Sequence, residues 1–178
     1  MACALTQGYT KKQCKDPSGV AEYIIGEWAN VAWTDNAKFA LTANVVTTFT
    51  MATGKQAWSY KQVPEIANWK QTGAGDAKTG GFGYKVEVNF QIQGIETLTQ
   101  EESELLLKNT LFVVAKHNDG TYWLLGHEFG LDASNVDTDS GTEMTSFKGD
   151  IIKLVGSATI KPKKVTSGLI AALLTPAS

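Results

Sequence analysis

Residues 82–93 alternate between apolar and polar side chains, and no other stretch constrains the fold of this chain as strongly. The even-numbered positions carry the apolar side chains Phe82, Tyr84, Val86, Val88, Phe90 and Ile92. From Lys85 onward, the odd-numbered positions carry the polar side chains Lys85, Glu87, Asn89, Gln91 and Gln93. A period of two residues over this length predicts a long β-strand with one buried face and one solvated face.

A similar alternation over residues 39–51 suggests the partner of this strand. We predict that the two runs form one long hairpin over about 39–95, with a large tip over 54–81 that is flexible in the free subunit. Loops of that length are usually functional or disordered. The side chains expected on the core face of the hairpin are Phe39, Leu41, Val45, Phe49, Tyr84, Val86, Val88 and Phe90.

The tip contains too many large apolar side chains for a simple linker. These side chains are Trp58, Tyr60, Val63, Ile66 and Trp69, and Pro64–Trp69 is expected to form a short helical turn. The tip therefore either folds back on its own subunit or docks on a neighbouring subunit.

Thr99 and Glu102 have the spacing of a capping box at a helix N-terminus. The acidic first turn and the leucine run at 105–107 agree with a helix at this point. We predict one helix over about residues 100–109.

The other segments make the chain mainly β. Two β-rich runs joined through Asp119–Gly120 predict a tight hairpin over 111–126. Residues 1–19 are expected to form an arm, and residues 20–31 a strand interrupted at Gly26. A loop is expected over 132–143, followed by a strand pair or bent strand over 147–160 that is broken near Gly156. The tail covers 161–178, and within it residues 167–174 form a short apolar helix or a strand. We predict a single domain over 1–178 of the α+β class, an antiparallel β-sandwich or barrel with one flanking helix.

The length and the N-terminus limit the class of protein. A chain of 178 residues is the size of one domain, and it contains no apolar run near the length of a membrane span. The N-terminus lacks the basic and apolar regions of a signal peptide, so we expect assembly in the cytosol and no membrane partner. Cys3 and Cys14 are too few for a disulfide framework and wrongly spaced for a zinc site.

All sixteen basic residues are lysine, and the formal net charge is −2. Arginine is the residue that grips phosphate groups with two hydrogen bonds, so its absence argues against a conventional nucleic-acid binder. The composition is still compatible with a surface that nucleic acid passes without binding.

Two groups of residues come closest to a chemical site. His117, His127 and Glu128 lie near the predicted hairpin, but they lack the HExxH spacing of a helical zinc site. Oxygen-bearing side chains alternate over Asp137–Glu143 without the full spacing of a calcium loop. The sequence has no nucleophile elbow, phosphate-binding loop or CxxC motif, so we expect no metal, no cofactor and no enzymatic activity.

Four segments carry a resemblance to a known family. They are Ala4–Tyr9 followed by Cys14–Asp16, the predicted helix Thr99–Asn109, the hairpin Val113–Gly130, and Gly141–Met144 running into Gly149. Together they resemble a bacteriophage major tail protein, the subunit of the tail tube, of the type found in phages of Bacteroidota. The resemblance covers most of the chain.

The resemblance implies a β-sandwich flanked by one helix and a long hairpin whose tip contacts the next ring. It implies rings of typically six subunits, stacked into a tube through which DNA passes without specific binding. The partners would be further copies of the chain and other phage tail proteins. The location would be the tail of the virion, after assembly in the bacterial host cytoplasm.

Two sets of site residues follow from this interpretation. The expected inter-subunit contacts are Trp58, Tyr60, Val63, Ile66, Trp69, Leu169 and Ile170. The expected channel-lining residues, taken from the polar parity of the hairpin, are Thr42, Asn44, Thr48, Thr50, Glu87, Asn89 and Gln91, with Lys85 near the rim. Such a wall would be polar and weakly acidic, and DNA would slide along it.

Three alternatives stay open at this point. The tail at 168–178 and the run Lys161–Lys164 do not map onto the family, which leaves room for a head decoration or connector protein. The tube protein of a contractile injection system would share the fold. The chain's five tryptophans suggest a carbohydrate-binding β-sandwich as a competitor from a different class.

Overall fold

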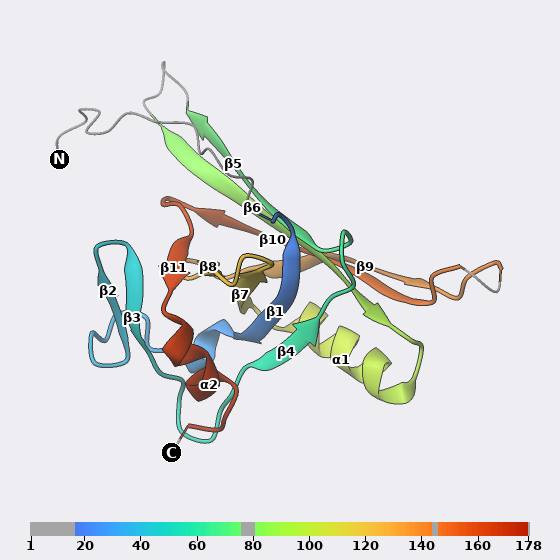
Figure 1. Ribbon diagram of the computed structural model, residues 1–178, viewed down its shortest axis with the longest axis horizontal. Coiled ribbons are helices and arrows are strands. Elements are labelled where there is room, and N and C mark those ends of the chain that lie inside the picture. Colours follow the sequence, from blue (N-terminus) through green and yellow to red (C-terminus); the bar gives the residue numbers. More distant parts are fainter. Residues whose placement is uncertain (1–16, 76–80, 144–145, 178) are drawn as a thin grey trace.

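The computed structural model describes residues 17–75, 81–143 and 146–177. These residues form a mainly β structure in which two sheets pack against each other (Figure 1). The larger sheet has seven strands in the order β2-β3-β11-β8-β7-β1-β4. Its strands are β1 (Val20–Glu27), β2 (Phe39–Thr42), β3 (Val45–Phe49), β4 (Trp58–Lys61), β7 (Leu111–His117), β8 (Tyr122–Leu125) and β11 (Lys163–Val165).

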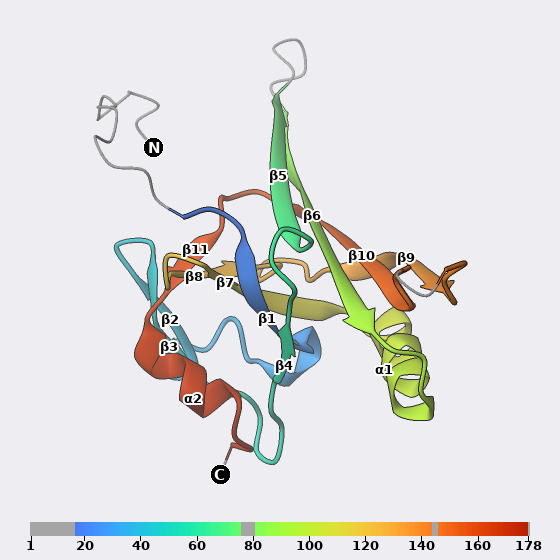
Figure 2. The same cartoon turned by 45° about the vertical axis from the view of Figure 1, so that its right-hand side comes forward.

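The smaller sheet has four strands in the order β5-β6-β10-β9, and every neighbouring pair is antiparallel. Its strands are β5 (Asn68–Gly75), β6 (Phe82–Gln93), β9 (Asp132–Asp139) and β10 (Gly149–Ala158). The β5–β6 hairpin and the β9–β10 hairpin both extend past the larger sheet, in different directions (Figures 1 and 2).

Helices occupy the margins of the two sheets. The long one is α1 (Thr97–Lys108), and the short ones are the 3₁₀ helices η1 (Trp28–Asn30) and η2 (Ser167–Leu169) and the single turn α2 (Ile170–Leu173). The predicted helix over 100–109 is confirmed, but it begins three residues earlier. The predicted capping box of Thr99 with Glu102 is wrong, because Glu96 is the N-cap and Thr99 is the third helical residue, whose hydroxyl accepts a hydrogen bond from the Glu96 amide at 2.9 Å.

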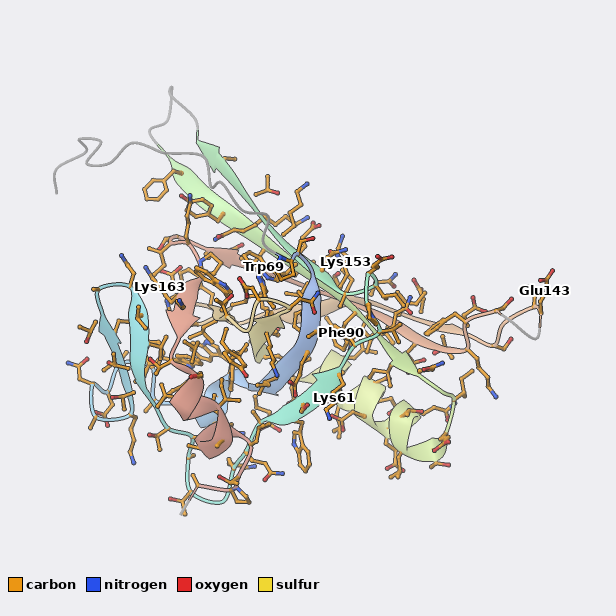
Figure 3. All side chains as sticks on the ribbon, viewed as in Figure 1. Lys61, Trp69, Phe90, Glu143, Lys153 and Lys163 are labelled. Atoms are coloured by element: carbon orange, nitrogen blue, oxygen red, sulfur yellow. The ribbon has the colours of Figure 1, made fainter. Side chains whose placement is uncertain are left out.

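The apolar side chains at the even-numbered positions of β6 fill the space between the sheets, as the alternation predicts. Val86, Val88 and Phe90 are at most 2% exposed and pack against the inner side chains of β1, β7 and β10. Phe90 points toward the larger sheet, while Lys153 of β10 lies on the opposite side of the smaller sheet (Figure 3). The Tyr23 and Phe90 rings meet at 5.7 Å between centroids.

A second core covers the far face of the larger sheet. Ile24, Phe112 and Val114 point to this side, where they meet the β2–β3 hairpin and α2. The central strands are therefore buried on both faces, which explains the continuous apolar run Leu111–Ala115. Gly26 has to be glycine because the Phe112 ring lies 2.6 Å from the position of a β-carbon.

The predicted pairing of residues 39–51 with the long strand is wrong. Ala43 and Asn44 take positive φ values of 49° and 67°, so the chain reverses there and forms its own hairpin, β2–β3. A register shift next to Leu41 leaves that side chain 41% exposed and buries Val46 in place of Val45. The true partners of β6 are β5, with Asn68 opposite Asn89, and β10, with Lys153 opposite Asn89.

The predicted loop over 54–81 contains two strands. β4 pairs with β1, and β5 pairs with β6, so most of this segment folds back on its own subunit. A turn covers residues 64–66, where Glu65 has a φ of 69°, and β5 replaces the rest of the expected helical turn. Residues 76–80, which end the predicted tip, lie outside the described residues.

Three further assignments differ in detail. The predicted loop over 132–143 is largely strand β9, since its polar residues alternate on a half-exposed sheet edge. β1 and β10 run unbroken through Gly26 and Gly156, which are glycines because a neighbouring group comes too close for a side chain. Residues 167–173 are helical, which confirms the helix alternative for the tail. The predicted arm is described only from residue 17 onward.

Tyr23 provides a test of this core. Its hydroxyl is buried and has no hydrogen-bond partner among the described residues. Because an unsatisfied buried polar group costs about 1–3 kcal/mol, Tyr23→Phe should leave the free energy of unfolding unchanged or raise it by about 1 kcal/mol. Chemical denaturation measures this.

Tyr60→Phe is the matched control. The Tyr60 hydroxyl donates to the Glu102 carboxylate, so this substitution should lower stability by about 1 kcal/mol. A clear loss of stability in Tyr23→Phe would contradict the packing described for Tyr23.

Candidate inter-subunit surface

The outer face of the smaller sheet collects polar side chains from all four strands. Strand register aligns Asn68, Asn89, Lys153 and Asn135 in one row across β5, β6, β10 and β9. The row above it contains Lys70 and Glu87. Among the described elements, the larger sheet and the helices lie on the other side of this sheet (Figures 1 and 2).

Charged groups of both signs lie on this outer face. Glu87 lies 2.8 Å from the Lys85 ammonium group and 3.3 Å from that of Lys153. Hydrogen bonds from Lys85 and then Lys153 hold the pKa of Glu87 below its ordinary value, so this carboxyl is ionised at neutral pH. With Lys70, Asp132, Asp137 and Asp139, the face has three lysines and four carboxylates, a formal sum of −1.

Three of the predicted channel-lining residues lie together on this face. Glu87, Asn89 and Gln91 are half-buried and occupy alternate positions of β6, as the polar parity requires. The Asn89 amide donates to Asn68 Oδ1 at 3.0 Å. Gln62 Oε1 accepts a hydrogen bond from the Gln91 backbone amide at 3.1 Å. This side chain therefore satisfies a backbone donor of β6 at a position that β5 does not reach.

The other four predicted channel-lining residues belong to a different surface. Thr42, Asn44, Thr48 and Thr50 lie on or beside the β2–β3 hairpin in the larger sheet, because the predicted strand pairing was wrong. The Lys163 ammonium group donates to Asn44 Oδ1 at 2.7 Å, which ties this hairpin to β11. These four residues do not share a face with Glu87.

Both edges of the smaller sheet are unpaired among the described residues. β5 and β9 are each eight residues long, and most of their side chains are exposed. Since successive strands of this sheet alternate in direction, the two edge strands run opposite to each other. An open edge of this length presents free backbone donors and acceptors to any further strand.

The two edges also differ in charge. Lys70 is the charged residue of the described β5, whereas β9 carries Asp132, Asp137 and Asp139. One edge is therefore basic and the other acidic. Sequence reasoning missed Lys70, Lys153 and these aspartates as surface determinants, since their strands were assigned to loops or left without a register.

The predicted inter-subunit contacts divide into exposed and packed residues. Trp58 is 59% exposed, Val63 53% and Ile66 37%, so these three remain available to a partner. Ile170 is only 8% exposed, and Leu169 packs against the same core. The predicted inter-subunit role of these two residues does not fit their burial, because the tail folds back on β3.

Tyr60 and Trp69 also make contacts within the subunit. The Tyr60 hydroxyl donates to Glu102 on α1, and Tyr60 packs against the inter-sheet core. The Trp69 indole donates to His117 Nε2 at 2.8 Å and thereby joins β5 to β7. Both residues support the root of the β5–β6 hairpin and stay partly exposed, so their contact with another subunit remains a prediction.

The residues considered as metal ligands do not converge. His117 accepts from Trp69, while the His127 ring packs against Trp33 and Phe39. The Glu128 carboxylate accepts from the Thr159 and Ile160 amides at the end of β10, and its pKa is below the ordinary value. Within the described residues, no group of three or more histidine, cysteine or acidic side chains is arranged to hold a metal ion.

The acidic run over Asp137–Glu143 begins on β9, where alternate side chains point to opposite faces of the sheet. Asp137 and Asp139 share the outer face, and the Asn135 amide donates to Asp137 at 2.6 Å. Cys3 and Cys14 lie outside the described residues. In the parts of the chain that the structure covers, no helix is both long and apolar enough to cross a membrane.

The comparisons with family models, with curated proteins and with solved structures found no match.

The Trp69–His117 hydrogen bond gives a prediction for the pH dependence of stability. Burial lowers the pKa of His117, against the opposing charge of Asp119, so folding favours the neutral ring. Stability from this residue is therefore present above the ordinary histidine pKa of about 6.5 and is lost as the pH falls through the lower folded-state pKa. Thermal unfolding at pH 7.5 and pH 5 should show a loss in acid.

His117→Gln should reduce this acid loss, because glutamine can accept a hydrogen bond without titrating. Part of the loss should persist, since burial also lowers the pKa of His127. An unchanged pH dependence in the variant would show that His117 does not contribute.

Proposed function

We propose that this protein is a structural subunit that closes into rings, and that these rings form the tail tube of a bacteriophage. The observation that carries the proposal is the smaller sheet. Among the described residues it has two unpaired edges that run in opposite directions, and its outer face is mainly polar with a formal charge sum of −1.

Ring closure would use the two edges. When copies stand side by side with the same face turned inward, β5 of one copy lies beside β9 of the next. The two strands are antiparallel, so the all-antiparallel pattern continues across the boundary. Closure would satisfy the free backbone groups of both edges and set Lys70 near the aspartates of β9.

The size of the resulting barrel suits a wide channel. Each copy contributes four strands, so a ring of the six subunits that the resemblance implies would have four times six, or 24, strands. Barrels of about 16–18 strands already leave an aqueous channel. The sandwich cores and helices would then lie on the outside of the ring.

The chemistry of the outer face suits passage of DNA without binding. Lysines that contact phosphate release counterions and hold DNA. On this face Lys85 and Lys153 share the Glu87 carboxylate, three aspartates of β9 add further negative charge, and the chain contains no arginine. A wall of this kind needs no enzymatic group, so we propose a non-enzymatic role with other tail proteins as further partners.

The burial of the tryptophans favours this function over carbohydrate binding. Trp28 and Trp33 stack on each other within the second core, and Trp69 is held by His117. Of the five tryptophans, only Trp58 is among the exposed large apolar residues. The alternatives would also form rings: they are a head decoration or connector protein and the tube of a contractile injection system. The shape of the assembly distinguishes these alternatives from a phage tail tube.

Charge reversal at the edges tests ring closure. Lys70→Glu should lower the ring population at a fixed concentration by at least about tenfold, because like charges then face each other at every boundary. Adding Asp137→Lys and Asp139→Lys to the same chain should recover part of the loss. Light scattering after size exclusion and electron microscopy measure both effects.

Lys161→Glu is the matched control, since Lys161 is exposed and lies outside every strand. It should assemble as the unmodified chain does. Rings that form normally with Lys70→Glu would show that β5 is not at the closing edge.

Lysine substitutions test the inner wall. Asn89→Lys together with Gln91→Lys should leave assembly intact and make assembled tubes retain duplex DNA at low salt. Each added phosphate contact should steepen the dependence of log affinity on log salt by about 0.9. Thr48→Lys is the control, because Thr48 lies on the larger sheet. Equal retention by the control would place the channel elsewhere.

A further inference from the structure

The two edge strands of the smaller sheet are staggered along the strand direction. Lys70 of β5 and Asp132, the first residue of β9, lie in the same row across the sheet. From this row β5 continues to Gly75 in one direction, and β9 continues to Asp139 in the other. The β5–β6 and β9–β10 hairpins therefore extend past each other at opposite ends of the sheet (Figures 1 and 2).

The Glu128 side chain covers the edge of β10 where β9 has not begun. The chain joins this edge only from Asp132 onward, because Leu131 pairs with β7. The Glu128 carboxylate accepts hydrogen bonds from the Thr159 amide at 2.6 Å and the Ile160 amide at 3.2 Å. A strand added at this point would find both donors occupied.

The Gln62 side chain covers the edge of β6 where β5 has not begun. β6 continues beyond Asn89, the partner of the first β5 residue, to Gln93. Gln62 Oε1 accepts a hydrogen bond from the Gln91 amide in this stretch at 3.1 Å. We call Gln62 and Glu128 the two stops, because each occupies backbone donors that a longer edge strand would need.

Opposite charges lie on the two edge strands. Lys70 of β5 and Asp137 and Asp139 of β9 are exposed on the same face of the sheet. None of these three residues forms an ion pair with another described residue. A second copy of the chain brings the basic edge of one subunit to the acidic edge of the next, so the charges favour this partner.

We propose that β5 of one copy pairs with β9 of the next in a single register, with Lys70 opposite Asp137. Within one subunit, Lys70 lies in the row of Glu87. Asp137 lies four residues further along β6, in the row of Gln91. Each copy is therefore shifted by four residues along the strands. This register rests on the proposed function and deepens it, because it names the residues that meet at each boundary.

The stops exclude smaller shifts. In the numbering of β6, β5 spans rows 82–89 and β9 spans rows 87–93. Without a shift the two strands would share only rows 87–89, and beyond these rows β9 would run into Gln62 and β5 would run into Glu128. A shift of two residues would still bring Asp139 against Gln62, whose oxygen covers row 91.

Larger and odd shifts are unfavourable for other reasons. A shift of six residues clears both stops, but it leaves one end of each strand unpaired. An odd shift would set Lys70 opposite an inner-face residue, because adjacent residues of a strand point to opposite faces. A shift of four residues pairs the whole of β9 with residues 68–74 and keeps the outer faces together.

The same shift gives the strand tilt of a closed barrel. Four residues across the four strands of each copy amount to one residue per strand, whatever the number of copies. With a rise of about 3.3 Å per residue and about 4.8 Å between strands, the strands tilt by about 35° from the ring axis. Closed barrels typically have tilts of about 35–45°, so a sheet joined in this register can close.

Paired cysteines test the register. With Cys3→Ser and Cys14→Ser in place, the full-length chain carries Lys70→Cys and Asp137→Cys, which lie on opposite edges of one subunit. A disulfide between them must therefore join two copies. In the proposed register the two Cβ atoms come within the reach of a disulfide, about 3.5–4.5 Å. Mild oxidation should give a ladder of linked chains, which gel electrophoresis measures.

Two matched pairs report the excluded shifts. Lys70→Cys with Asp132→Cys reports no shift, and Lys70→Cys with Asn135→Cys reports a shift of two residues. Both should cross-link at least about tenfold more slowly than the pair with Asp137→Cys, since disulfides require closely opposed positions. Faster cross-linking of either matched pair would overturn the proposed register.

These readouts separate the register from ring closure. Ladders from the Lys70→Cys and Asp137→Cys pair, in a chain that forms no closed rings, would support the register and contradict the proposed function. Closed rings without such ladders would overturn the register and leave the proposed function standing.

Removal of the stops tests whether they block the smaller shifts. Gln62→Ala with Glu128→Ala should speed cross-linking of both matched pairs by about threefold or more, because the uncovered edges can then pair. Hydrogen exchange at the Gln91 and Thr159 amides confirms that the edges are uncovered. The exchanged variant Gln62→Glu with Glu128→Gln keeps both acceptors and the net charge, so it should behave as the parent does. Unchanged cross-linking in the alanine variant would overturn the blocking role.

Discussion

Packing of β6 against β1 and β7 is the contact on which the two-sheet structure depends. Val86, Val88 and Phe90 are buried against Tyr23 and its neighbours, and burial of each such side chain contributes about 1.5–3 kcal/mol. This packing turns the opposite face of the smaller sheet outward. Among the described residues, nothing pairs with either edge of the smaller sheet, because the sandwich core covers only its inner face.

Polar contacts hold the parts that extend beyond this core. The Trp69–His117 hydrogen bond fixes the root of the β5–β6 hairpin. The buried Asp150 carboxylate accepts from Ser103 on α1 and, at 2.7 Å, from Thr138 on β9, so one group joins the helix to the β9–β10 hairpin. These ties set the direction of both hairpins relative to the core.

Local patterns predicted the elements whose signals lie within one segment. Alternation identified β6 and the direction of its two faces, and the Asp119–Gly120 turn identified the β7–β8 hairpin. Glu87, Asn89 and Gln91 were placed correctly on the solvated face for the same reason. The strands β5 and β9 were missed because their glycines, aspartates and other polar residues resemble loops when the partner strand is unknown.

The sequence by itself determined that the chain is mainly β, with one capped helix and one long two-faced strand, because periodicity and capping act over a few residues. Only the tertiary structure decided the partners of that strand, since strand pairing joins residues far apart in the chain. It separated Thr42 and Thr48 from Glu87 by a turn at Ala43–Asn44 that alternation does not reveal. It also brought Lys70, Lys153 and Asp137 onto one surface, because register across four strands fixes which side chains share a face.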